Sequence, residues 1–324
     1  MIFNKIKLNY NIKLIDDHFS NKSYKEVNKL LEDKVSNPDL FYSLTNYILQ
    51  KYLVNNSHKG FFNKKFIWVV SYDLDDTIYI NKFLNFYLGK QKTSFVQDNY
   101  ADFFSNKMLQ LNLKQFPKKL TFNDVVSVSQ LLQNILLLSN KFQYLLMTTK
   151  AAFYEATENR FLIYPNNSLA YFSVIRSPLS LYRKYKTQST NNQDALNKLI
   201  NFNLEDAEKE IFNNPNTYSL VENIQNWNAN TKSWSDENVK NTFRGKQIRY
   251  EDLSQNTHDT LVEVIYHLKQ GGMNIDIDYD LIKEFVDSNT FNEESFADTE
   301  SSSEIKMLSN NLDKDLLEEF HYQI

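Results

Sequence analysis

The chain has 324 residues, a formal net charge of −4, and 42% apolar against 23% charged residues, a balance typical of globular proteins. It contains no cysteine, which excludes disulfides, thiolate metal sites and cysteine nucleophiles. The slightly acidic charge provides no basic footprint for nucleic acid, and no stretch reaches the roughly 18–20 consecutive apolar residues of a membrane span, so we expect a cytoplasmic protein with neither partner.

The N-terminal part of the sequence predicts helices. Residues 1–16 lack the continuous apolar stretch and small-residue cleavage site of a signal peptide. From about Tyr24 to Tyr52, apolar residues recur at helical spacing, with a break at Pro38. We therefore expect an N-terminal helical extension over residues 1–60, followed by the main domain at 61–324.

A strand, a loop and a helix are expected next. The apolar run Phe66–Val70 is short and rich in β-branched residues, which indicates a buried parallel strand. The polar stretch Ser71–Asp76 follows it, and apolar residues repeat at helical spacing from Ile78 onward. This layout is typical of a phosphate-binding unit. However, the loop has none of the glycines that let a backbone approach a phosphate closely.

Further strands alternate with helices along the rest of the chain. Strands are predicted at Tyr144–Met147, Leu169–Ile175 and Lys246–Tyr250, and helices at Phe122–Leu138, Leu196–Trp234 and His258–Leu268. Such alternation predicts an α/β fold with a parallel sheet flanked by helices. Asp73, Lys150, Arg176 and Tyr250 each follow a predicted strand. Because ligands bind beyond the carboxyl ends of parallel strands, we expect these residues to converge.

Four segments, taken in order, carry a resemblance to a known enzyme family. Trp68–Tyr72 looks like a strand that introduces a phosphosulfate loop, and Phe172–Pro178 looks like a strand with an Arg-x-Pro turn. Asn226–Trp234 is similar to a tryptophan-containing helix, and Ile248–Leu253 to an Arg-Tyr-Glu-Asp-Leu segment. Together, over about Lys65–Asn292, they resemble the sulfotransferases. The resemblance implies a P-loop-NTPase-like α/β domain that transfers a sulfuryl group from 3′-phosphoadenosine 5′-phosphosulfate (PAPS) to a hydroxyl or amine of an unidentified acceptor.

The resemblance implies roles for three cationic residues. Arg176 would bind the 3′-phosphate of PAPS or of its product PAP, a role that suits the planar guanidinium. Lys184, eight residues later, stands where the family has a serine that contacts the same phosphate. Lys150 stands where the family has its catalytic histidine. A lysine serves as a base when burial or a neighbouring cation lowers its pKa.

The remaining family positions are partly retained. Thr77 matches a threonine of the phosphosulfate loop, and Tyr250 and Phe291 would lie near the adenine. Leu74 and Asp76, in contrast, replace the basic residue and the glycine of that loop, and no glycine follows residue 272 to form the family's C-terminal phosphate loop. Two interpretations therefore stay open: a divergent sulfotransferase, or a catalytically inactive protein that keeps the fold for binding or regulation.

The same loop also matches a different motif. Residues 73–77 have the Asp-x-Asp-x-Thr spacing of haloacid-dehalogenase-like phosphatases, in which Asp73 would be the nucleophile and Asp75 the acid/base beside Mg²⁺. A later pair of carboxylates would have to complete that metal site, whereas the sulfotransferase interpretation needs no metal. A third, structural interpretation is that Asp75 or Asp76 caps the following helix and places a protein carboxylate in the anion site.

Overall fold

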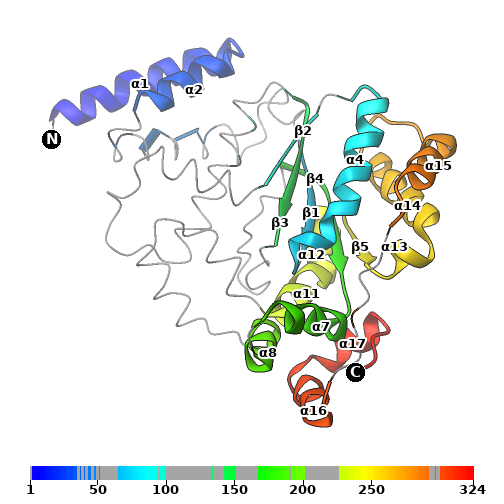
Figure 1. Cartoon of the computed structure of the whole chain (residues 1–324). Coiled ribbons are helices and arrows are strands. Elements are labelled where there is room, and N and C mark those ends of the chain that lie inside the picture. Colours follow the sequence, from blue (N-terminus) through cyan, green and yellow to red (C-terminus); the bar gives the residue numbers. More distant parts are fainter. Residues whose placement is uncertain are drawn as a thin grey trace.

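A five-stranded parallel sheet forms the centre of the protein (Figure 1). The structure is a computed structural model that describes residues 2–34, 65–93, 95–99, 142–150, 167–189, 191–200, 226–291 and 300–324, with the single residues 37, 40, 43, 44, 47, 48, 51, 133, 137 and 296. The strands are β1 (Lys65–Ser71), β2 (Phe95–Asn99), β3 (Tyr144–Thr149), β4 (Ser168–Ile175) and β5 (Gly245–Arg249), in the order β2-β3-β1-β4-β5. The predicted α/β fold with a parallel sheet is confirmed.

The apolar runs account for three of these strands. Every residue of β3 and β4 is buried, as is all of β1 after Lys65, which explains why these strands have continuous apolar sequences. β2 pairs only with β3 at the edge of the sheet. Its sequence becomes polar after Val96, so its pattern does not predict a strand.

Helices flank the sheet. They are α4 (Ile78–Lys90), α7 (Pro178–Gln188), α8 (Asn192–Ile200), α11 (Trp227–Ser235), α12 (Glu237–Phe243), α13 (Asp252–Gln255), α14 (Thr257–Gln270), α15 (Tyr279–Ser288), α16 (Ser302–Asn311) and α17 (Lys314–Glu319). In Figure 1, α4, α14 and α15 lie together on one side of the sheet, where their apolar side chains share a core with Phe172 and Val174 of β4. Tyr171 faces the other way, and its ring centroid lies 4.8 Å from that of Trp234 in α11.

The predicted helices are confirmed where the structure describes them. The helix from Ile78 is α4, the helix after Arg176 is α7 with Pro178 in its first turn, and the helix ending near Gly271 is α14. The helix expected at 122–138 lies outside the described residues apart from 133 and 137, and 201–225 likewise lie outside them. Within the described chain, no helix combines the length and the apolar content needed to cross a bilayer.

Two N-terminal helices have a small core of their own. α1 (Ile2–Ser20) and α2 (Tyr24–Glu32) contribute Ile15, Phe19 and Val27 to it. Both helices lie in the predicted helical extension. The apolar spacing indicated only the segment that contains α2, because asparagine and lysine interrupt the apolar pattern of α1. Residues 52–64 lie outside the described residues, so the domain boundary at residue 60 remains a prediction.

Gly245, at the start of β5, is a position where any larger residue should destabilise the fold. A Cβ atom there would overlap the side chain of Tyr171, which is buried and donates a hydrogen bond to the carbonyl of Trp234 at 2.6 Å. We expect Gly245→Ala to lower the free energy of unfolding by about 1–3 kcal/mol, the usual cost of overpacking a core. Urea denaturation would measure it. Gly89→Ala is the matched control, since no atom other than its chain neighbours and the backbone of its own helix lies within 4 Å of the added Cβ. An equal loss there would contradict the steric explanation.

Candidate functional site

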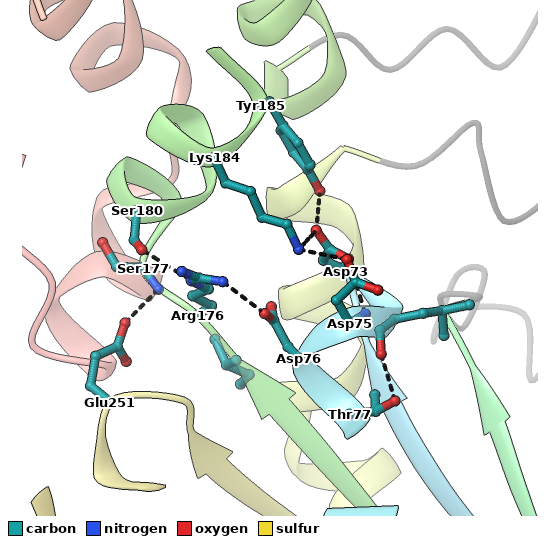
Figure 2. Close-up of polar contacts among 12 residues, drawn as sticks. Asp73, Asp75, Asp76, Thr77, Arg176, Ser177, Ser180, Lys184, Tyr185 and Glu251 are labelled. Atoms are coloured by element: carbon teal, nitrogen blue, oxygen red, sulfur yellow. Dashed lines mark hydrogen bonds and ion pairs between the residues drawn. The ribbon is translucent and has the colours of Figure 1, made fainter. Parts of the chain in front are cut away.

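The candidate site lies at the carboxyl ends of β1 and β4. These strands are neighbours in the centre of the sheet, with Val70 opposite Ser173. The strands that follow them, β2 and β5, lie at opposite edges, so the strand order reverses between β1 and β4. Open α/β sheets bind ligands at such a reversal, beyond the carboxyl ends of the strands. Loop 72–77 and turn 176–178 meet there (Figure 2).

Loop 72–77 folds on its own aspartates. Leu74–Thr77 forms a 3₁₀ turn whose N-cap is Asp73: Oδ1 of Asp73 accepts a hydrogen bond from the backbone N–H of Asp75 at 3.1 Å. Thr77 donates its hydroxyl to the carbonyl of Leu74 at 2.7 Å, and α4 begins after it without a side-chain cap. The prediction that Asp75 or Asp76 caps the helix is therefore wrong. Asp73 caps the 3₁₀ turn instead, and the carboxylates of Asp75 and Asp76 reach across to α7 and the turn.

A buried ion pair joins the loop to the turn. Nη1 of Arg176 lies 3.0 Å from Oδ1 of Asp76, and the two side chains are 0% and 1% exposed. Nε of Arg176 donates to the hydroxyl of Ser180 at 3.0 Å, and Cζ lies 4.3 Å from the ring centroid of Tyr250. The guanidinium is thus held by an anion, a hydroxyl and an aromatic face at once.

Burial and the ion pair with Arg176 have opposite effects on the pKa of Asp76. Burial raises the pKa of Asp76 to about 7, and this outweighs the neighbouring Arg176 guanidinium, which favours the ionised form. Oδ2 of Asp76 has no hydrogen-bond partner among the described residues, so the negative charge is poorly solvated. The carboxyl therefore titrates near neutral pH, and its hold on Arg176 weakens as it takes up a proton.

Lys184 is held by the other two aspartates. Its Nζ lies 2.9 Å from Oδ2 of Asp75 and 3.0 Å from Oδ2 of Asp73, and the hydroxyl of Tyr185 donates to Asp73 at 3.2 Å (Figure 2). Burial lowers the pKa of Lys184, but the two carboxylates outweigh burial and hold it above its usual value. The Lys184 side chain is 2% exposed and that of Asp75 is 64% exposed. Asp75 therefore lies between the Lys184 ammonium group and the solvent.

Aromatic rings line the site beside the guanidinium. The ring of Phe291 lies 5.1 Å from that of Tyr250 and 4.9 Å from that of Tyr79, measured between centroids. Tyr79 is on the first turn of α4 and donates its hydroxyl to the carbonyl of Asn289 at 2.9 Å. Tyr250 and Phe291, which the resemblance implied near the adenine, are in contact with each other; their role toward a nucleotide remains a prediction. Tyr79 itself belongs to the main hydrophobic core of the sheet and its helices.

The polypeptide around Arg176 is fixed by two further residues. The indole of Trp227 donates to the carbonyl of Arg176 at 3.1 Å, and Oε1 of Glu251 accepts from the backbone N–H of Ser177 at 3.0 Å. This contact of Glu251 is that of a residue that stabilises a turn. No local spacing links Trp227 or Glu251 to Arg176, so sequence reasoning had no signal for either contact.

Thr77 and Lys150 lie on the β1–β3 side of the same edge. The amide of Asn81 donates to the hydroxyls of Thr77 and Thr148, both at 3.1 Å, which ties α4 to the end of β3. Lys150 follows β3, and its carbonyl accepts from the side-chain amide of Asn230 at 2.7 Å. The strand order thus brings Lys150 to the predicted edge, while its role as a base remains a prediction.

The loop carboxylates are engaged by cations rather than grouped around a metal position. Asp73 and Asp75 share Lys184, and Asp76 pairs with Arg176. Across the described ranges, no three His, Cys, Asp or Glu side chains are grouped so that they could hold a metal ion.

No protein-family model matches the chain, and neither does any curated protein. The function is therefore argued from the site itself.

Proposed function

We propose that this chain is a sulfotransferase-like protein whose anion site is filled by its own carboxylates, and that it serves in binding or regulation rather than sulfuryl transfer in this state. The buried ion pair between Arg176 and Asp76 carries the proposal. The residue that the resemblance assigns to the cofactor 3′-phosphate already has an acidic partner. The residue beside it, Lys184, has two.

The charge at the site supports this proposal. Three loop carboxylates face two cations, so the net charge of the cluster is negative when all five groups are ionised. A bisphosphorylated nucleotide would have to displace Asp76 from Arg176 and would meet Asp73 and Asp75 at short range. Like charges a few ångströms apart near a protein surface repel by roughly 4 kcal/mol each. The resting site therefore disfavours PAPS and PAP.

A divergent sulfotransferase is the second candidate, and the clustering of its implied residues favours it. Arg176, Lys184, Tyr250 and Phe291 gather at one edge of the sheet, and burial raises the pKa of Asp76, the carboxyl that pairs with Arg176, to about 7. If the loop withdrew, both cations would be released toward a phosphate, with Lys150 nearby at the end of β3. Arg176 and Lys184 would then hold PAPS, which would supply the sulfuryl group. Lys150, in its neutral form, would take the acceptor proton, and PAP would leave with the electron pair of the broken bond.

The phosphatase interpretation has the weakest support. Its nucleophile and acid/base, Asp73 and Asp75, both contact the Lys184 ammonium at 2.9–3.0 Å. That ammonium sits between the two carboxylates, where a bridging cation would have to lie. A magnesium-dependent phosphatase would therefore require Lys184 to leave.

The test is calorimetric titration with PAP of the wild type and of the variant Asp73→Asn/Asp75→Asn/Asp76→Asn. Asparagine keeps the acceptor oxygen at position 73 and removes the three charges. We expect no micromolar binding by the wild type and an affinity at least about tenfold higher for the variant, because each removed repulsion amounts to more than the 1.4 kcal/mol that a tenfold change requires.

The control adds Arg176→Met to the triple variant and should remove the gained affinity. Micromolar binding by the wild type without metal would favour the second candidate, the divergent sulfotransferase. Binding only with Mg²⁺ would favour the phosphatase. A triple variant that folds but gains nothing would contradict the self-filled anion site.

A further inference from the structure

The last 25 residues pack against the outside of the candidate site. Residues 300–324, here called the C-terminal strap, contain α16 and α17 and lie with α7 and α8 below the carboxyl edge of the sheet (Figure 1). Apolar side chains of the strap share a core with α7, α8 and Trp227, among them Leu308, Leu312, Leu316 and Phe320. Just before the strap, the ring centroid of Phe296 lies 5.7 Å from Cζ of Arg176. A residue only four positions before the strap therefore contacts the guanidinium.

Glu304 anchors the strap to α7 and α8. Its Oε1 accepts from the hydroxyl of Tyr182 and from the amide of Asn192, both at 2.6 Å, and Oε2 lies 3.2 Å from Nζ of Lys186. Ser301 completes a capping box through its backbone N–H and its hydroxyl. Burial raises the pKa of Glu304, but these hydrogen bonds outweigh burial and hold the pKa at about 2. Glu304 is therefore charged at any physiological pH.

The contacts of Glu304 with α7 lie on both sides of Lys184 in the sequence. Tyr182 and Lys186 precede and follow Lys184 by two residues in α7, and both bind Glu304. Between them, Arg183 pairs with Glu300 of the strap, with Nε 2.5 Å from Oε1. The strap thus fixes the turn of α7 that presents Lys184 to the loop aspartates.

The far end of the strap reaches the polypeptide next to Arg176. The hydroxyl oxygen of Tyr322 lies 2.8 Å from the carbonyl oxygen of Ile175 and 2.9 Å from Oε2 of Glu251. The other oxygen of Glu251 accepts from the N–H of Ser177. Burial, with the Glu251 carboxylate adding to it, raises the pKa of Tyr322, so its hydroxyl stays a donor. Tyr322 and Glu251 thereby hold both residues adjacent to Arg176.

We propose that the C-terminal strap is a positioning element of the anion site, in which Tyr322 and Glu251 fix the Arg176 turn and Glu304 fixes the Lys184 turn. The proposal rests on the proposed function in treating Arg176 and Lys184 as the anion-binding groups. Neither Tyr322 nor Glu251 touches the Arg176 guanidinium through a hydrogen bond that the structure describes, so both act through the backbone.

The test compares Tyr322→Phe with Tyr171→Phe. Both substitutions delete one buried hydroxyl that donates to a backbone carbonyl, but Tyr171 donates to Trp234, away from Arg176. Each should lower Tm by about 2–4 °C. Only Tyr322→Phe should alter the site, which is followed by carboxyl ¹³C NMR titration of Asp76. Arg176, Lys184 and Asp73 are the charged groups that act on Asp76.

Because a less firmly placed guanidinium favours the ionised carboxyl less, Tyr322→Phe should raise the midpoint of the Asp76 titration by about one pH unit. In the triple asparagine variant, it should weaken PAP binding about tenfold. Equal titration midpoints in Tyr322→Phe, Tyr171→Phe and the wild type would overturn the proposal. If the triple variant does not bind PAP at all, the proposed function fails, and the NMR titration still decides the role of the strap.

Discussion

Arg176→Met is expected to lower the free energy of unfolding by about 3 kcal/mol at pH 7, the lower end of the range for removing one partner of a buried ion pair. The guanidinium loses its contact with Asp76, its hydrogen bond to Ser180 and its stacking on Tyr250. The cost stays at the lower end because the Asp76 carboxyl left behind can take up a proton. Urea denaturation followed by circular dichroism would measure it.

The pH dependence of this variant distinguishes electrostatics from lost packing. A carboxyl whose pKa is raised by folding destabilises the folded state as pH rises from the unfolded pKa to the folded pKa. In the wild type this window runs from about 4 to about 7 for Asp76. Without Arg176 the pKa of Asp76 rises further, so the window extends above pH 7.

The difference in unfolding free energy between the wild type and Arg176→Met should therefore widen above pH 7, by up to about 1.4 kcal/mol per pH unit. Asp76→Asn is the control, because it removes the titrating group and with it the loss of stability between pH 4 and 7. A constant difference from pH 6 to 9 would show that Asp76 does not respond to Arg176.

Trp227→Ala is expected to cost about 3–5 kcal/mol, because the fully buried indole leaves a large cavity next to the Arg176 turn. The substitution also leaves the carbonyl of Arg176 without its indole donor. Thermal and urea denaturation would measure the loss. Trp227→Phe retains most of the volume and should cost only about 1–3 kcal/mol, through the unpaired carbonyl.

Trp234 provides the matched comparison on the same helix. It is equally buried, but its ring packs on Tyr171 rather than on the turn. In the triple asparagine background, Trp227→Phe should weaken PAP binding while Trp234→Phe leaves it unchanged. If both phenylalanine variants weaken PAP binding equally, Trp227 has no special link to the site.

The sequence by itself determined the class of fold and the edge of the sheet where the site lies. Continuous apolar runs at β1, β3 and β4 are readable because strands buried on both faces need apolar residues at every position. Parallel strands place their carboxyl ends at one edge, so Arg176 and the loop after β1 were expected to converge, and they do. β2 was not predicted, because an edge strand tolerates polar residues.

Only the tertiary structure decided which groups pair at that edge. Asp76 and Arg176 are 100 residues apart, and Tyr322 lies 147 residues from the carbonyl that it contacts. The local sequence shows that one loop is acidic and that one turn is basic. Strand order and register determine which loop faces which turn. Because β1 lies beside β4, the loop carboxylates reach the cations of α7 and its turn, and a sequence typical of an anion site becomes a site that its own side chains fill.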